Sequence, residues 1–182
     1  MKKKINFNKL LFEFISVSFA VTFALFVNQW REDYNNQKLA QNSLRNIKEE
    51  LLENKETLEE LLSIHEAHLE KIDSLMLLEV EVDEDSISDV NIVLLSSSAW
   101  EMAKVTQAVY YIPFDDINNL AKVYDFKLYY ESLIKQHVLK DSFSSDVQVS
   151  LKKQKSFLET IIPMERDLAH YCELMLTDVL KD

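Results

Sequence analysis

Glycine is absent from this chain of 182 residues, and proline occurs only at Pro113 and Pro163. A chain of average composition would carry about 13 glycines. The absence excludes sites that need glycine backbone geometry, such as P-loops, dinucleotide-binding turns, nucleophile elbows and EF-hand loops. It also disfavours hairpin-rich β folds, whose tight turns favour residues with positive φ. We therefore expect an all-α protein.

Cysteine and positive charge are scarce as well. Because Cys172 is the single cysteine, the chain forms no intramolecular disulfide and no cysteine-rich metal site. The net charge is −11, yet residues 1–27 carry +3, which leaves −14 for the remainder. A domain this acidic repels phosphate backbones, so we expect no nucleic-acid partner.

Residues 10–30 are long and apolar enough to cross a bilayer. Leu10 to Val27 contains one charged residue, Glu13, and the segment through Trp30 spans about 31 Å as a helix. Trp30 falls where indole rings are favoured, as an anchor at the membrane interface. A cleaved signal peptide is the alternative, but the long apolar run lacks a clear small-residue site after it, which favours a retained anchor.

The basic tail of residues 1–9 indicates the orientation of this predicted span. Short segments rich in lysine stay in the cytoplasm, whereas long domains are translocated largely regardless of charge. We therefore expect a single-pass protein of the cytoplasmic (inner) membrane, with its N-terminus inside and an extracytoplasmic C-terminal domain.

One face of the predicted membrane helix carries small and polar residues. They are Glu13, Ser16, Ala20, Ala24 and Asn28. Small side chains at this spacing let helix backbones approach closely in lipid, and ionisable groups within spans often face a partner. The pattern predicts a contact with another membrane helix, from a second copy or a different protein. Alternatively, the Glu13 side chain extends to the headgroups.

Residues 31–78 form a predicted stalk and first bundle helix, since no helix breaker interrupts Lys9 to Leu78. A bend is expected at residues 33–36. Beyond them, a heptad pattern predicts a coiled-coil-like seam that packs against other helices. The predicted a and d positions are Leu44, Ile47, Leu51, Asn54, Leu58, Leu61, His65, His68, Ile72 and Leu75. The flanking glutamates, Glu50 among them, are expected to be solvated.

Residues 79–182 are predicted to supply the remaining helices of an antiparallel bundle, in one domain with residues 40–78. The acidic segment 79–89 is expected to be a solvated connection. Capping-box patterns predict helix starts near residues 87 and 99, and Pro113 suits the first turn of another helix. The last predicted helix extends from Val147 to Val179, with a kink at Pro163.

The sequence offers little that could carry catalysis. His65 and His68 are three residues apart, whereas the zinc-protease motif needs a spacing of four. Metal binding by this pair is the minor alternative to polar seam positions, for which replacement of both by leucine should be tolerated. Cys172, Ser96–Ser98 and His137 form no readable triad. We expect no catalytic residue, no cofactor and no enzyme activity.

Aromatic residues gather in the second half of the chain, and core packing explains most of them. The alternative is a ligand groove or partner surface formed by Trp100, Tyr110, Tyr111 and Tyr124.

The segment from Glu13 to Trp30, with its opening glutamate, Ala24-Leu25 near its end and charged exit, resembles a widespread group of uncharacterised bacterial membrane-anchored proteins. Ala99-Trp100 and Leu120-x-x-x-Tyr124 are similar to the second half of that group. The resemblance implies a bacterial single-pass protein with a helical domain, and it implies no activity.

These patterns favour a non-catalytic, membrane-anchored helical interaction or scaffold subunit. Its expected partners are the membrane and either another protein or a second copy, through the membrane helix and the stalk. The alternative is an extracytoplasmic ligand-sensing bundle that acts through a partner, since helical bundles can hold small molecules between their helices.

Overall fold

The computed structural model describes residues 7–77, 90–141 and 147–179, and these residues contain no β-strand. The predicted all-α fold is confirmed. The elements are α1 (Phe7–Leu77), α2 (Ser98–Val105), the 3-10 turn η2 (Ala108–Tyr111), α3 (Phe114–Asp141), α4 (Val147–Leu174) and the π-helical turn η3 (Met175–Val179). Residues 1–6 of the predicted basic tail (residues 1–9) and the acidic segment 79–89 lie outside the described residues.

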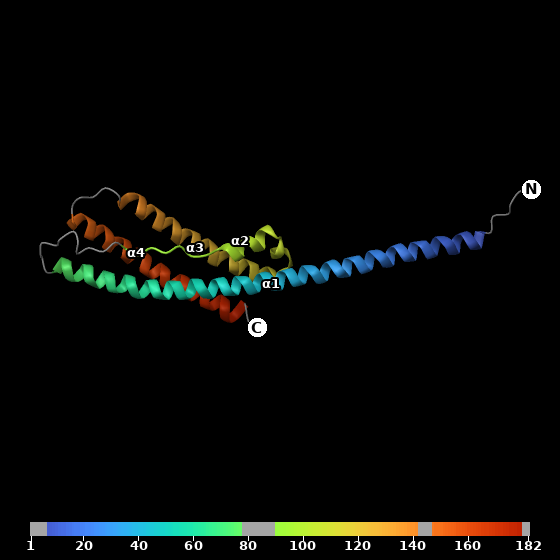
Figure 1. The fold of residues 1–182 in the computed structure, drawn as a ribbon, viewed down its shortest axis with the longest axis horizontal. Helices are drawn as coiled ribbons and strands as arrows, with labels where there is room; N and C mark the ends of the chain where they lie inside the picture. Colours follow the sequence, from blue (N-terminus) through green and yellow to red (C-terminus); the bar gives the residue numbers. More distant parts are fainter. Residues whose placement is uncertain (1–6, 78–89, 142–146, 180–182) are drawn as a thin grey trace, which may run out of the picture.

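Helix α1 is a single helix of 71 residues that joins the apolar segment to the bundle. Figure 1 shows its N-terminal part projecting beyond the other helices as a rod. No residue from 10 to 39 is buried, and Ala40 is the first buried one. The helix passes through residues 33–36 without interruption, where the sequence had suggested a bend. Near its N-terminus, α1 is long and apolar enough to cross a membrane.

Three long helices form the bundle, and they do not all alternate in direction. Figure 1 shows α3 running in the same direction as α1, whereas α4 runs antiparallel to both. Residues 90–97 are not helical and lead back along the bundle to α2. Because the connection returns the chain to the starting end, α1 and α3 are parallel. The predicted antiparallel arrangement therefore describes only the pairs that include α4.

The predicted seam of α1 faces the core. Every one of its a and d positions is buried or half-buried, including Leu51, Leu58 and Ile72 at 0–1% exposure. Leu51, Leu58 and Ile72 belong to one cluster with apolar residues of α3 and α4, such as Leu120 and Leu158. Each fully buried leucine or isoleucine contributes about 1.5–3 kcal/mol, so this stripe is the main apolar support of the bundle.

Two details of the predicted helices differ from the structure. Residues 90–97 are extended, so no helix that starts near residue 87 continues through them, and α2 begins at Ser98. Leu128 lies one helical turn after the buried Tyr124 on α3, a spacing that predicts burial, yet it is 58% exposed. The last helix begins at Val147 as predicted, but α4 ends at Leu174 and a π-helical turn continues to Val179; the kink at Pro163 stays a prediction.

Candidate functional site

A buried carboxylate on α1 holds the start of α2. Glu50 is 4% exposed, and its oxygens accept hydrogen bonds from the backbone N–H groups of Ala99 at 2.8 Å and Trp100 at 3.4 Å. The first N–H groups of a helix lack partners within the helix and carry a partial positive charge. Ser97, at the N-cap position, makes no side-chain cap. The cap of α2 therefore comes from another helix.

Three hydroxyl groups complete the shell around Glu50. Ser96 and Ser98 donate to Oε2 at 2.8 and 3.1 Å, and the Tyr124 hydroxyl donates to Oε1 at 2.6 Å. Burial alone raises the pKa of the Glu50 carboxyl, but these hydrogen bonds and the one from Ala99 together hold it below its ordinary value. The carboxylate is thus kept ionised and is occupied by internal donors.

The segment before α2 is fixed by the same face of α1. The Asn54 side chain donates to the Ser96 carbonyl at 2.9 Å and accepts from the Ser96 N–H at 2.8 Å. The Trp100 ring stacks on Tyr124 with centroids 5.0 Å apart and an interplanar angle of 4°. The expectation that Glu50 is solvated is therefore wrong. Its place beside the seam was the only signal in the sequence, because its partners lie 46–74 residues away.

A second buried polar site joins all three long helices. His65 of α1 lies 3.0 Å from Glu165 of α4 through Nδ1 and 2.7 Å from the Asn91 carbonyl through Nε2. The Tyr130 hydroxyl of α3 donates to the other Glu165 oxygen at 2.7 Å. Both ring nitrogens face acceptors, so both can donate only when the imidazole is protonated.

Electrostatics in this second site favour the charged imidazole. Burial lowers the pKa of His65, but the hydrogen bond and negative charge of Glu165 outweigh it and leave the pKa raised. Burial and Glu165 also raise the pKa of Tyr130. His68 differs, because burial and the nearby Lys71 lower its pKa. The arrangement is an internal ion pair with a neutral tyrosine beside it.

The histidines predicted as minor metal candidates therefore occupy different environments. The His65 ring is taken up by Glu165 and Asn91, while His68 is half-buried beside Gln154. Across residues 7–77, 90–141 and 147–179, no group of three or more histidine, cysteine, aspartate or glutamate side chains is arranged to hold a metal ion.

The predicted membrane-helix interface lies on the uncovered part of α1. Glu13, Ser16, Ala20, Ala24 and Asn28 are all exposed, because no other described element packs on this part of the helix. Trp30, the predicted interfacial anchor, is 70% exposed.

The four predicted surface aromatics separate into two pairs. Trp100 and Tyr124 are buried at 8% and 2% exposure and belong to the core around Glu50. Tyr110 and Tyr111 of η2 are 78% and 47% exposed. Only the second pair is available to a partner.

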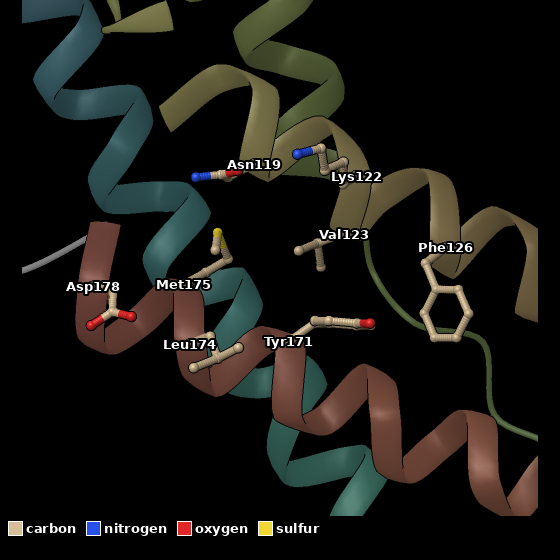
Figure 2. Close-up of a pocket in the computed structure, with 8 residues that line it drawn as sticks. All are labelled: Asn119, Lys122, Val123, Phe126, Tyr171, Leu174, Met175 and Asp178. Atoms are coloured by element: carbon tan, nitrogen blue, oxygen red, sulfur yellow. The ribbon is translucent and has the colours of Figure 1, made fainter. Parts of the chain in front are cut away.

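A pocket of about 500 Å³ opens between α3 and the C-terminal end of α4. Figure 2 shows its walls, and Phe126 meets Tyr171 edge-on at 5.7 Å between ring centroids. The lining residues are Asn119, Lys122, Val123, Phe126, Tyr171, Leu174, Met175 and Asp178. None of them was predicted as a site residue. Each helix reveals its own apolar face in the sequence, but nothing there indicates which faces meet.

Comparison of this chain with protein-family models, curated proteins and solved structures finds no match. Within the described residues, the geometry includes two internally satisfied polar sites, the pocket between α3 and α4, and the uncovered apolar part of α1.

Proposed function

We propose that this chain is a non-catalytic, membrane-anchored helical module that joins or holds a protein assembly at a bacterial cytoplasmic membrane. The observation that carries the proposal is the continuity of α1. One helix contains both an uncovered apolar segment and the seam that organises the bundle. Because the proposed membrane anchor and the core helix are one continuous helix, the anchor fixes the position of the bundle relative to the membrane.

The buried polar groups support a structural role over a catalytic one. Glu50 is surrounded by donors from α2 and α3, and His65 is held between Glu165 and Asn91. General acid–base catalysis requires a group within reach of a substrate proton. These two sites are turned inward and hold helices together.

The proposed orientation places the bundle outside the cytoplasm, and its support is the lysine-rich tail. A periplasm-active reporter fused after Asp182 should be active, and a cytoplasm-active reporter at the same site should not. Activity of the cytoplasmic reporter alone would overturn the orientation.

The proposed contact with the assembly includes the small-residue face of the membrane segment. Ala20→Leu places a bulky side chain on that face and should weaken association in a membrane two-hybrid or crosslinking assay. Phe19→Leu is the matched control, because Phe19 is 71% exposed next to Ala20 and points elsewhere. Equal association of both variants would contradict the proposed interface.

The pocket supports a second candidate function, a ligand-sensing bundle that acts through a partner. Its apolar walls and the charged side chains of Lys122 and Asp178 suit a small amphipathic molecule. Native mass spectrometry after gentle detergent extraction should then detect a retained small molecule, and Met175→Trp, which fills the pocket, should abolish that signal. The control is Tyr129→Trp, at an exposed position outside the pocket. The same mass spectrum in all three proteins would contradict ligand sensing.

A further inference from the structure

Large apolar side chains protrude where the chain turns from α2 through η2 into α3. Met102, Val105, Tyr110 and Phe114 are 59%, 77%, 78% and 80% exposed, and we call these four residues the tip patch. The turn is tight, with Gln107 in the left-handed region at φ 62°. Beneath it, Ala103 and Ala108 are buried at 0–1% exposure, so the turn is packed on the core while its large side chains face outward.

The tip patch belongs to the end of the bundle nearest the apolar segment. In Figure 1 the turn lies at the end from which α1 continues towards the N-terminus. Both α2 and η2 pack against α1. Helix α1 ends with Leu77 at the opposite end of the bundle (Figure 1). The patch therefore lies at the end of the bundle nearest the proposed membrane (Figure 1).

The distance from the membrane to the tip is short. Ala40, the first buried residue of α1, marks the end of the bundle at which the tip lies. Ten residues separate it from Trp30, which corresponds to about 15 Å of helix. The headgroup layer takes up about 5–7 Å of this distance. A helix tilt of about 20° towards the tip, a size that is average for membrane spans, lowers an element packed about 10 Å to that side by a further 3–4 Å. The remaining gap is within the reach of tyrosine and phenylalanine side chains.

The charges around the tip distinguish between kinds of lipid. Asp115 and Asp116 occupy the first turn of α3, and Lys104 is paired with Glu101 at 2.7 Å. The tip therefore has no basic excess with which to attract anionic headgroups. Tyrosine and other amphipathic rings favour the membrane–water interface without any contribution from lipid charge. The tip therefore suits a zwitterionic surface.

We propose that the tip patch lies in the headgroup layer of a zwitterionic bilayer and holds the bundle against the membrane that α1 crosses. This proposal rests on the membrane anchoring given under Proposed function. It gives the bundle two attachments to the membrane, one through α1 and one through the turn between α2 and α3.

The test measures the depth of single labelled positions in the full chain. Tyr110→Cys, Phe26→Cys and Leu77→Cys each carry an environment-sensitive fluorophore, in phosphatidylcholine nanodiscs that hold one chain each. Headgroup-level and acyl-chain nitroxide lipids then act as quenchers. The native Cys172 is 1% exposed and burial raises its pKa to about 12, so it stays unlabelled, and unsubstituted protein checks this.

The expected result is strong quenching at Phe26 by acyl-chain nitroxides and quenching at Tyr110 by headgroup-level nitroxides, about twofold or more above Leu77. Leu77 is a matched control, since it is 83% exposed at the far end of the bundle. Phe114→Asp should reduce quenching at Tyr110. Tyr129→Asp also replaces an exposed aromatic residue by aspartate, but outside the patch, so it should leave that quenching unchanged.

The other outcomes separate the two proposals. Quenching at Phe26 with Tyr110 no higher than Leu77 overturns the tip contact and leaves the anchor intact. No quenching at Phe26 overturns the anchor and the tip contact together. If the fluorophore at Tyr110→Cys is shielded from solvent only when a nanodisc holds two chains, the patch contacts a second copy. If it is shielded only after an assembly protein is added, the patch contacts that protein. Either result overturns the lipid contact.

Discussion

Glu50 meets five donors from the α2 region and α3, so its charge matters more than its shape. Glu50→Gln keeps the size of the side chain but turns an amide N–H₂ towards some of those donors. We expect a loss of about 1.5–3 kcal/mol in the free energy of unfolding at pH 7, the range for hydrogen bonds to charged groups. Urea denaturation measures this loss. The neighbouring exposed Glu49→Gln should change it by no more than about 0.5 kcal/mol.

The pH dependence of the Glu50 variant adds an independent check. The pKa of this carboxyl is lower in the folded chain than its ordinary value of 4.5. Its contribution is therefore present above pH 4.5 and is lost as the pH falls through the folded pKa. The difference in unfolding free energy between the native chain and Glu50→Gln should shrink in acid. A difference that stays constant down to pH 3 (about 1.5 below the ordinary pKa) would contradict the proposed role of the charge.

His65 calls for a different expectation from the one suggested by its seam position. Replacing it by leucine leaves Glu165, which is 0% exposed, without its cationic partner. Removing one member of a buried pair costs about 3–5 kcal/mol, whereas replacing both members by apolar residues is often much less costly. We expect His65→Leu to be strongly destabilising in thermal and urea unfolding. The double variant His65→Leu, Glu165→Leu should be more stable than His65→Leu, and the exposed His170→Leu should be neutral.

The sign of the His65 effect with pH is opposite to that of Glu50. Its pKa is raised above the ordinary 6.5 in the folded chain, so its contribution is complete below pH 6.5 and is lost as the pH rises through the folded value. His68 shifts in the other direction and is retained in both proteins. The unfolding free energy of the native chain should therefore fall more steeply above pH 6.5 than that of His65→Leu. Parallel pH profiles would contradict the ion pair.

At the scale of the elements, α2 is a short helix that depends on α1 in two ways. Glu50 caps its N-terminus, and Asn54 holds the segment that leads into it. Asn54→Ala removes both hydrogen bonds to the main chain of Ser96. We expect the amide protons of Ser96 and Ala99 to exchange with solvent about tenfold faster, since such local segments open independently of the core. Amides in the seam of α1 should keep their protection. The exposed Asn46→Ala serves as the control, and equal exchange in both variants would exclude this role for Asn54.

The elements also explain which features could be predicted from the sequence. Leu51 and Leu58 were assigned to the core because the heptad repeat is a local property of one helix. The burial of Glu50 could not be predicted, since it depends on Ser96, Ala99 and Tyr124, which only the tertiary fold brings together. The parallel direction of α1 and α3 likewise depends on the extended return of residues 90–97, where a capping-box pattern suggested a helix.

The same reason applies to the open pocket. Val123 and Phe126 lie on α3, whereas Tyr171 and Met175 lie on α4 and η3. Helical periodicity assigns each residue to a face of its own helix, but the meeting of the two faces depends on packing across the bundle. The aromatic group proposed from the sequence included Tyr124, which is one residue from the pocket wall and is buried instead.

For the whole molecule, the uncovered part of α1 should be dispensable for folding. No residue from 10 to 39 is fully buried, only Asn36 and Leu39 among them are half-buried, and the first fully buried residue is Ala40. A chain shortened to residues 31–182 should therefore stay soluble and unfold cooperatively. Its Tm should lie within about 4 °C of that of the full chain in detergent, the shift expected for less than about 1 kcal/mol. Aggregation or loss of a cooperative transition would show that the anchor is part of the folding unit.

The unbroken helix also fixes the direction in which the small-residue face of the proposed membrane segment points. At about 100° per residue, the 20 steps from Ala20 to Ala40 make about five full turns of α1 plus a further 200° or so. Ala40 faces the bundle, so Ala20 points to the opposite side of the rod. A partner helix seated on Ala20 thus continues along the back of α1, where the bundle leaves it open.

That back surface carries an ordered series of charges. Lys38 and Arg45 lie in line with Ala20 on the side of the proposed membrane segment, Glu49 and Glu56 follow further out, and all four are exposed. A second copy in parallel register would bring equal charges together at each level, which is unfavourable. A helix with acidic residues first and basic residues beyond them would match. The order of charges along the back of α1 therefore favours a different protein over a second copy of this chain as the helix that packs there.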